Sequence, residues 1–109
     1  MSTIYMSTKT LGEKLRQLRE QNELPLRKVA ALLDIDVAIL SKMERSERKL
    51  SKEVVLKLAD IYKHNSEELL ILFLSEKIMY EIQDEELGIQ ALKVAERKVK
   101  YLKTKINAD

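Results

Sequence analysis

Apolar side chains recur at helical spacing in five successive segments between residues 10 and 74. Thr10 is a candidate N-cap for the first helix, and Asn22 is the expected left-handed residue at its end. Pro25 is expected at the first position of the second helix, and Asp36 and Ser51 as N-caps of the third and fourth. The apolar residues expected to face the core are Leu11, Leu15, Leu18, Leu26, Val29, Ala30, Leu33, Leu40, Met43, Val54, Val55, Leu58, Ala59 and Ile61. The polar residues expected on the outside of the first helix are Lys14, Arg16, Arg19 and Glu20.

The fifth helix is expected to begin at Ser66, to be apolar through Leu74 and then to become amphipathic. A break between residues 83 and 88 is indicated by one helix breaker, Gly88. We therefore divide the chain into a frayed N-terminus (1–9), a helical domain (10–74) and a C-terminal helical segment (75–109). The triplet "MST" occurs at Met1 and again at Met6, so either methionine is a candidate native start. The C-terminal segment carries a stripe at three-to-four-residue spacing, which could cover the chain's own bundle or pair with a second chain: Leu87, Ala91, Val94, Ala95, Val99, Leu102 and Ile106.

The composition favours an all-α fold and argues against most enzyme chemistry. The chain has 109 residues with only 2 Gly and 1 Pro, which is too few for the tight turns of an all-β protein. It has no Cys and a single His, His64, so it lacks a disulfide, a thiolate zinc site and a cysteine nucleophile, and histidine catalysis has little room. Asp84, Glu85 and Glu86 are consecutive on a helix and diverge around its axis, which favours a solvated acidic segment over a metal site. We therefore expect no enzyme, no cofactor and no metal. No apolar run approaches the roughly 18 residues of a membrane span, so we expect a cytoplasmic protein.

The net charge of +2 conceals three zones. Residues 1–66 contain 13 basic and 9 acidic side chains, a net charge of +4. Residues 67–86 contain 1 basic and 7 acidic side chains, a net charge of −6. Residues 87–109 contain 6 basic and 2 acidic side chains, again a net charge of +4. The first basic zone suits moderate, salt-sensitive binding to a polyanion.

The second and third helices are short, and a tight turn joins them, which is the geometry of a DNA-reading helix-turn-helix. Such a motif needs a small residue where the helices cross, and Ala30 stands there. It needs an apolar residue that fixes the turn to the core, and Ile35 stands there. Because Leu40 and Met43 face inward, the third helix leaves four residues free to face base edges in the major groove: Val37, Ala38, Ser41 and Lys42.

The run from Leu24 to Tyr62, "LPLRKVAALLDIDVAILSKMERSERKLSKEVVLKLADIY", resembles the phage-repressor-like helix-turn-helix family, the XRE family. The closest local similarity is "ILSKMERSERKLS", and the resemblance extends from about residue 9 to residue 73. It implies a five-helix, lambda-repressor-like DNA-binding domain and a transcriptional regulator, most often a repressor. The sequence departs from the family pattern at Leu26, where a Gln is usual, and at Asp34 and Ser46, where a Gly is usual. Asp34 must therefore adopt a left-handed conformation.

Side-chain chemistry and position suggest roles within the motif. Lys42 is the best candidate for a guanine contact, and Val37 and Ala38 suit thymine methyl groups. Glu44 resembles a family position that braces the motif without touching a base. The candidate phosphate contacts are Arg27, Lys28, Arg45, Arg48 and Lys49.

The family domain ends near Phe73, so the segment beyond it has little core left to cover. We therefore expect a homodimer that reads two half-sites of double-stranded DNA. Two alternatives remain open. The chain could be an antitoxin that binds a toxin and its own operator, or a controller of a restriction–modification system. It could also be a protein-interaction module on the same scaffold, since Leu26, Val37 and Ala38 replace polar positions. The residues assigned to dimerisation are Leu87, Ala91, Val94, Ala95, Val99 and Leu102.

Overall fold

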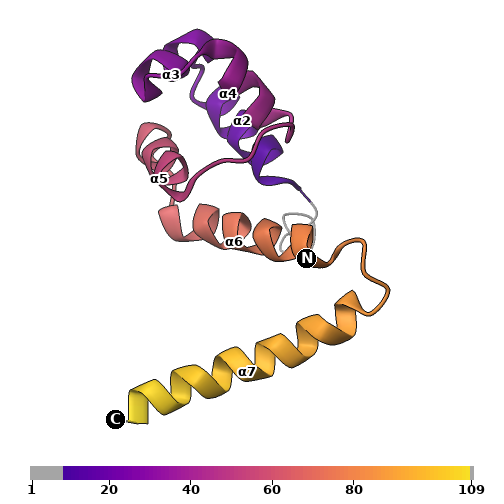
Figure 1. Ribbon diagram of the computed structural model, residues 1–109. Coiled ribbons are helices and arrows are strands. Elements are labelled where there is room, and N and C mark those ends of the chain that lie inside the picture. Colours follow the sequence, from indigo (N-terminus) through magenta and orange to yellow (C-terminus); the bar gives the residue numbers. More distant parts are fainter. Residues whose placement is uncertain (1–8, 109) are drawn as a thin grey trace. The chain divides into compact units, whose positions relative to one another are not determined.

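A computed structural model describes residues 9–108 of the chain, with side chains as far as Ile106. The expected fraying of residues 1–9 and the choice between Met1 and Met6 concern residues 1–8, which lie outside the described residues. Within that range the protein is all-helical, without a strand, and the expected all-α class is confirmed. None of its helices is long and apolar enough to cross a membrane. The helices are α2 (Leu11–Gln21), α3 (Leu26–Leu33), α4 (Val37–Glu44), α5 (Lys52–Ile61), α6 (Ser66–Ile82) and α7 (Gly88–Ala108) (Figure 1).

Side-chain caps begin two helices where the sequence predicts them. The Thr10 hydroxyl accepts from the Glu13 N–H (3.1 Å), and the Ser51 hydroxyl accepts from the Val54 N–H (3.2 Å). Asp36 is the N-cap residue of α4, but its carboxylate makes no capping hydrogen bond. The prediction for Pro25 is wrong by one residue. Its ψ of 149° is extended, so it caps α3 from outside and its carbonyl accepts from the Lys28 and Val29 N–H groups.

Four successive helices end at a non-glycine residue with positive φ: Glu23 (54°), Asp34 (57°), Ser46 (61°) and Lys63 (51°). Each of these residues donates its N–H to the carbonyl three residues earlier, and the residue after it donates its N–H to the carbonyl five residues earlier. This pair of hydrogen bonds is the Schellman arrangement. The left-handed conformation expected at Asp34 is confirmed. The prediction for Asn22 is wrong, since its φ is −87° and its side-chain amide instead donates to the Leu18 carbonyl (2.7 Å).

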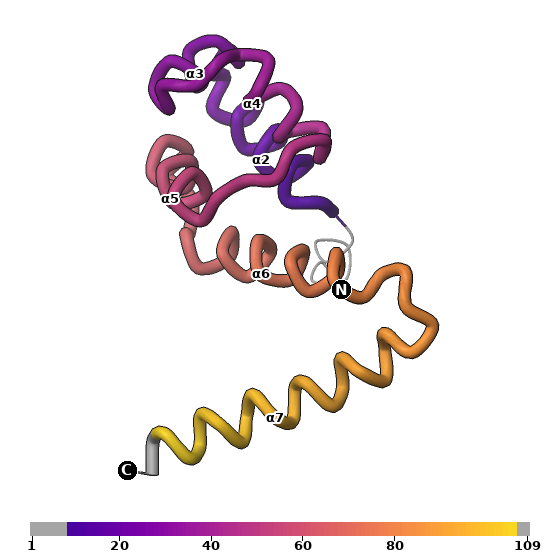
Figure 2. The backbone as a smooth tube through the Cα atoms, viewed as in Figure 1, coloured from indigo at the N-terminus to yellow at the C-terminus, as the bar shows by residue number. Residues whose placement is uncertain are grey.

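The core of the first helical unit is built from one face of each of α2 to α6, and α4 packs against both α2 and α3 (Figures 1 and 2). Gly12 permits the close approach of α2 to the end of α4, because a Cβ atom there would lie 2.5 Å from the Met43 carbonyl oxygen. Tyr62 joins this core although the sequence pattern did not assign it there. The buried apolar residues are Leu11, Leu15, Leu18, Val29, Ala30, Leu33, Leu40, Met43, Val55, Leu58, Ala59, Tyr62, Leu69 and Phe73.

Helix α6 is attached to the start of α2 by a long-range hydrogen bond, in which the Leu11 N–H donates to the Glu76 carboxylate. Burial raises the pKa of Glu76, while the bond to Leu11 lowers it and nearby Glu13 raises it. The chain divides into two compact units directly after Glu76. The middle of α6 is therefore held by a partner 65 residues away in sequence.

The second unit contains the last residues of α6, a turn and α7. The expected break is present, since α6 ends at Ile82 and α7 begins at Gly88. A Cβ atom on Gly88 would lie 2.7 Å from the Ile82 carbonyl oxygen, so this turn depends on glycine for space rather than for a special φ. Every described side chain of α7 from Ile89 to Ile106 is exposed.

Candidate nucleic-acid interface

The turn between α3 and α4 is held from both sides. Ala30 is buried where the sequence predicts a small residue, and Ile35 packs against the core from the turn. The Ile35 N–H donates to the Ala30 carbonyl (3.0 Å), and the left-handed Asp34 lets the chain reverse there. On the inner side of α4, Leu40 is buried in the core. These contacts fix the orientation of α4 relative to α3.

The outer side of α4 carries the four residues assigned to base contacts. Val37, Ala38 and Lys42 are exposed, and Ser41 is half-buried. Their spacing of one, three and one residues places them on one face of the helix. The side opposite this face holds the buried Leu40. The structure thus brings the four side chains together, while their contact with bases stays a prediction.

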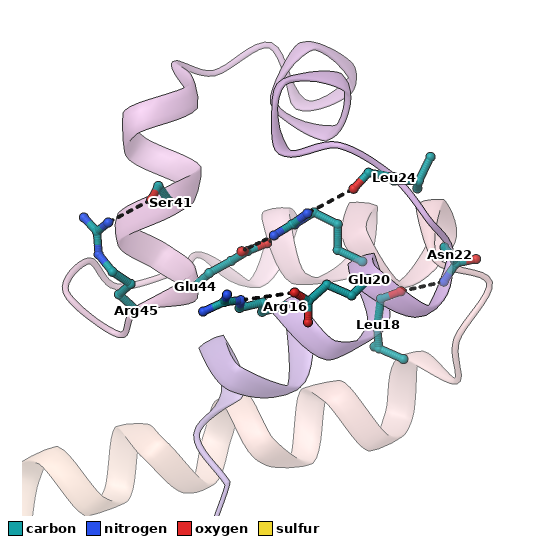
Figure 3. Close-up of polar contacts among 9 residues, drawn as sticks. Arg16, Leu18, Glu20, Asn22, Leu24, Ser41, Glu44 and Arg45 are labelled. Atoms are coloured by element: carbon teal, nitrogen blue, oxygen red, sulfur yellow. Dashed lines mark hydrogen bonds and ion pairs between the residues drawn. The ribbon is translucent and has the colours of Figure 1, made fainter.

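Arg45 and Ser41 interact on the outer side of α4, away from Glu44 (Figure 3). The Arg45 Nη1 donates to the Ser41 hydroxyl (3.0 Å). The Arg45 Nε donates to a Glu47 carboxylate oxygen (3.1 Å), in an ion pair whose two side chains are both half-exposed. A phosphate oxygen would have to compete with Glu47 for this guanidinium.

The other candidate phosphate contacts lie on two segments. Arg27 and Lys28 are exposed in the first turn of α3, and Arg48 and Lys49 are exposed between α4 and α5. The positive end of the α3 dipole adds to the charge of Arg27 and Lys28. The two segments precede and follow α4 in the sequence, and the phosphate contacts of these residues stay predictions.

Glu44 is the only charged residue described that is fully buried, and it faces inward to α2 (Figure 3). Its carboxylate accepts two hydrogen bonds from Arg19, at 2.7 Å from Nε and 3.0 Å from Nη2. Arg19 also donates to the Leu24 carbonyl (3.0 Å). The hydrogen bond to Glu44 raises the pKa of Arg19, which keeps the guanidinium charged. The buried pair therefore joins the end of α4 to α2, which is the kind of contact expected of a residue that braces the motif.

The prediction that Arg19 and Lys14 lie on the outside of α2 is wrong. The Arg19 side chain is 14% exposed because it pairs with Glu44, and the Lys14 side chain is equally exposed and lies 3.7 Å from a Glu68 oxygen. The sequence does contain a signal, since Arg19 follows Leu15 by four residues on the core-facing side. Spacing alone does not reveal the acidic partner on another helix.

Tyr62 is buried close enough to this pair to feel its charges. Burial raises the pKa of its phenol, and the charge of Glu44 raises it further, so the hydroxyl stays protonated at neutral pH. Among the described residues, no group of three or more histidine, aspartate or glutamate side chains is placed to hold a metal ion. The arrangement is therefore a helix held on its inner side by charge pairing and burial, with a mixed apolar and basic outer side.

The residues assigned to dimerisation all lie exposed in the second unit, and their role stays a prediction. Leu92 belongs to the same helix surface, because it precedes Ala95 by three residues and Val99 by seven. The exposed members of the assigned set are Leu87, Ala91, Val94, Ala95, Val99 and Leu102.

Comparison with known proteins agrees with this geometry. A family model described as a helix-turn-helix domain matches residues 10–70, which include α3, the turn and α4. A search of curated proteins found no match. The match covers more than half of the chain and supports a DNA-binding regulator. The chain belongs to the helix-turn-helix domain family.

Proposed function

We propose that the protein is a sequence-specific transcriptional regulator of the phage-repressor-like type, which binds double-stranded DNA as a homodimer and represses by occupying its operator. The proposal rests mainly on the residues exposed on the outer side of α4. There Val37, Ala38 and Lys42 are exposed together on a helix whose inner side is fixed by burial and by the Arg19–Glu44 pair. We expect no catalytic activity and no cofactor.

The chemistry of this face suits a short, mixed readout. Lys42 can donate to guanine O6 and N7, and Val37 and Ala38 can pack against thymine methyl groups. Arg48 and Arg27 would neutralise phosphates and thereby set the register of the helix in the groove. An eight-residue helix reads few base pairs, so a symmetric pair of subunits on two half-sites gives the affinity that one subunit lacks.

Fluorescence-anisotropy titrations test this assignment with three variants on an operator-like and a random duplex over a range of salt. Lys42→Ala is expected to cost about 1–3 kcal/mol at one base step and little on random DNA, because Lys42 reads a base. Arg48→Ala is expected to weaken binding on all duplexes and to reduce the salt slope by about 1. Lys57→Ala is the matched control, since Lys57 is an exposed cation on α5 that pairs with Glu53 (3.2 Å). Equal losses for Lys42→Ala and Arg48→Ala on both duplexes would contradict the base contact.

A protein-interaction module is the second candidate, and exposed apolar residues near the motif favour it. Leu32 is 59% exposed and Val37 is 41% exposed. Leu26, by contrast, packs partly against the core, which explains an apolar residue at that position without a partner. A folded protein that binds no duplex even at low salt would support this second function.

A further inference from the structure

The outer face of α6 is apolar and uncovered. Ile71, Leu74 and Ile78 recur at helical spacing and are 66%, 54% and 47% exposed. The opposite side of the same helix buries Leu69 and Phe73 in the core. A soluble helix normally exposes a polar face, so this second apolar face requires a partner.

Helix α7 also carries an uncovered apolar stripe, which we call the seam. The residues of the seam recur at alternating spacings of three and four along the helix, which is the pattern of a two-helix interface. In the chain none of them is buried, and Ile106 is 72% exposed. The seam consists of Leu92, Ala95, Val99, Leu102 and Ile106.

The charges beside these two faces are opposite. Helix α7 contains six basic side chains and one acidic side chain, and α6 contains four acidic side chains and one basic side chain. Lys98 and Lys105 follow seam residues by three positions, so they lie at its edge. Glu67 precedes Ile71 by four positions, and Glu81 follows Ile78 by three.

These charges decide between possible partners for the seam. Two α7 helices paired in parallel would place Lys98 of one helix opposite Lys103 of the other, with two strongly basic helices side by side. An α6 face would present acidic side chains to the same seam instead. The lengths also agree, because Glu67 to Glu81 and Leu92 to Ile106 each contain fifteen residues, about 21 Å of helix from first to last.

We propose that α7 of one copy covers the outer face of α6 of a second copy, and that the second copy returns the same contact. This inference rests on the homodimer of the proposed function and specifies how that dimer forms. The two contacts are related by a two-fold axis, so each acidic α6 face and each basic α7 seam is used once in a closed pair.

Charge-swapped full-length variants test the exchange by sedimentation equilibrium. Lys98→Glu/Lys105→Glu places acidic seams against acidic faces, and Glu67→Lys/Glu81→Lys places basic seams against basic faces. Each variant alone is expected to dimerise at least about tenfold more weakly than the wild type. A 1:1 mixture of the two is expected to recover dimerisation, because each α6 then meets an α7 of opposite charge. Wild-type dimerisation is expected to weaken as salt is raised.

Lys93→Glu/Arg97→Glu is the matched control, since it makes the same charge change on the side of α7 away from the seam. It is expected to change the dimer dissociation constant less than about threefold, and thermal melting checks that every variant is folded. A tighter Lys98→Glu/Lys105→Glu dimer, with no gain on mixing, would overturn the exchange in favour of an α7–α7 dimer and leave the homodimer intact. A wild-type chain that stays monomeric at millimolar concentration would overturn the exchange and the homodimer together, while leaving the separate DNA titrations to judge α4.

Discussion

The two units of the chain use the same apolar spacing with opposite results. In the first unit Leu58 and Leu69 are fully buried, because neighbouring helices cover them. In the second unit Leu102 and Ile106 also belong to an apolar stripe at helical spacing, and they are 55% and 72% exposed. An amphipathic pattern therefore predicts a helix and the face that needs cover, but it does not say which molecule supplies the cover.

The sharpest way to test this comparison is to remove a leucine from each unit. Leu69→Ala is expected to lower the free energy of unfolding by about 2–5 kcal/mol, since it leaves a cavity in a packed core. Leu102→Ala is expected to change it by less than about 0.5 kcal/mol at low protein concentration, because that side chain is uncovered in one chain. Urea denaturation at several protein concentrations measures both effects. Equal losses at low concentration would show that α7 is covered within its own chain.

The charged pairs of α2 offer a second contrast, within one helix. Arg19→Met is expected to cost about 3 kcal/mol, because it leaves the Glu44 carboxylate buried without a partner. Arg16→Met is the control and is expected to cost less than about 1 kcal/mol, since the Arg16–Glu20 pair is more than half exposed. Chemical denaturation of both variants gives the two values. A similar small loss for each would mean that Glu44 finds another partner or is hydrated.

The smallest expected effect concerns the left-handed helix ends. Lys63→Gly is expected to raise the free energy of unfolding by up to about 1 kcal/mol, because glycine adopts a φ of 51° without the steric cost of a side chain. Lys63→Ala keeps the Cβ atom and is expected to give no such gain. Differential thermal melting compares the two. A melting temperature of Lys63→Gly below that of Lys63→Ala would show that the unfolded chain's added freedom outweighs the relief of strain.

Local signals made much of the fold predictable from sequence. Thr10 and Ser51 cap helices as expected, and Ala30, Leu40 and Met43 are buried as expected, because caps and helix faces depend on neighbours in sequence. The errors at helix boundaries arise where a single residue can occupy two adjacent positions. A proline φ fits the N-cap as well as the first helical position.

Long-range partners could not be predicted in the same way. Glu44 lies 25 residues from Arg19, and Leu11 lies 65 residues from Glu76, so only the packed helices bring these groups together. For the candidate site, spacing was enough to place Lys42 on the outer side of α4. The attachment of Arg45 to Ser41 and Glu47 depends on the rotamer of a long side chain, which no sequence pattern specifies.

Selection from a random duplex pool shows whether α4 reads DNA. The wild type and Lys42→Ala are carried through the same rounds at moderate salt. We expect the wild type to enrich two related half-sites about one helical turn apart, and Lys42→Ala to lose the preference at one base step of each half-site. Failure of the wild type to enrich any sequence, or an unchanged motif with Lys42→Ala, would contradict the assignment of α4 and Lys42 as the reading elements.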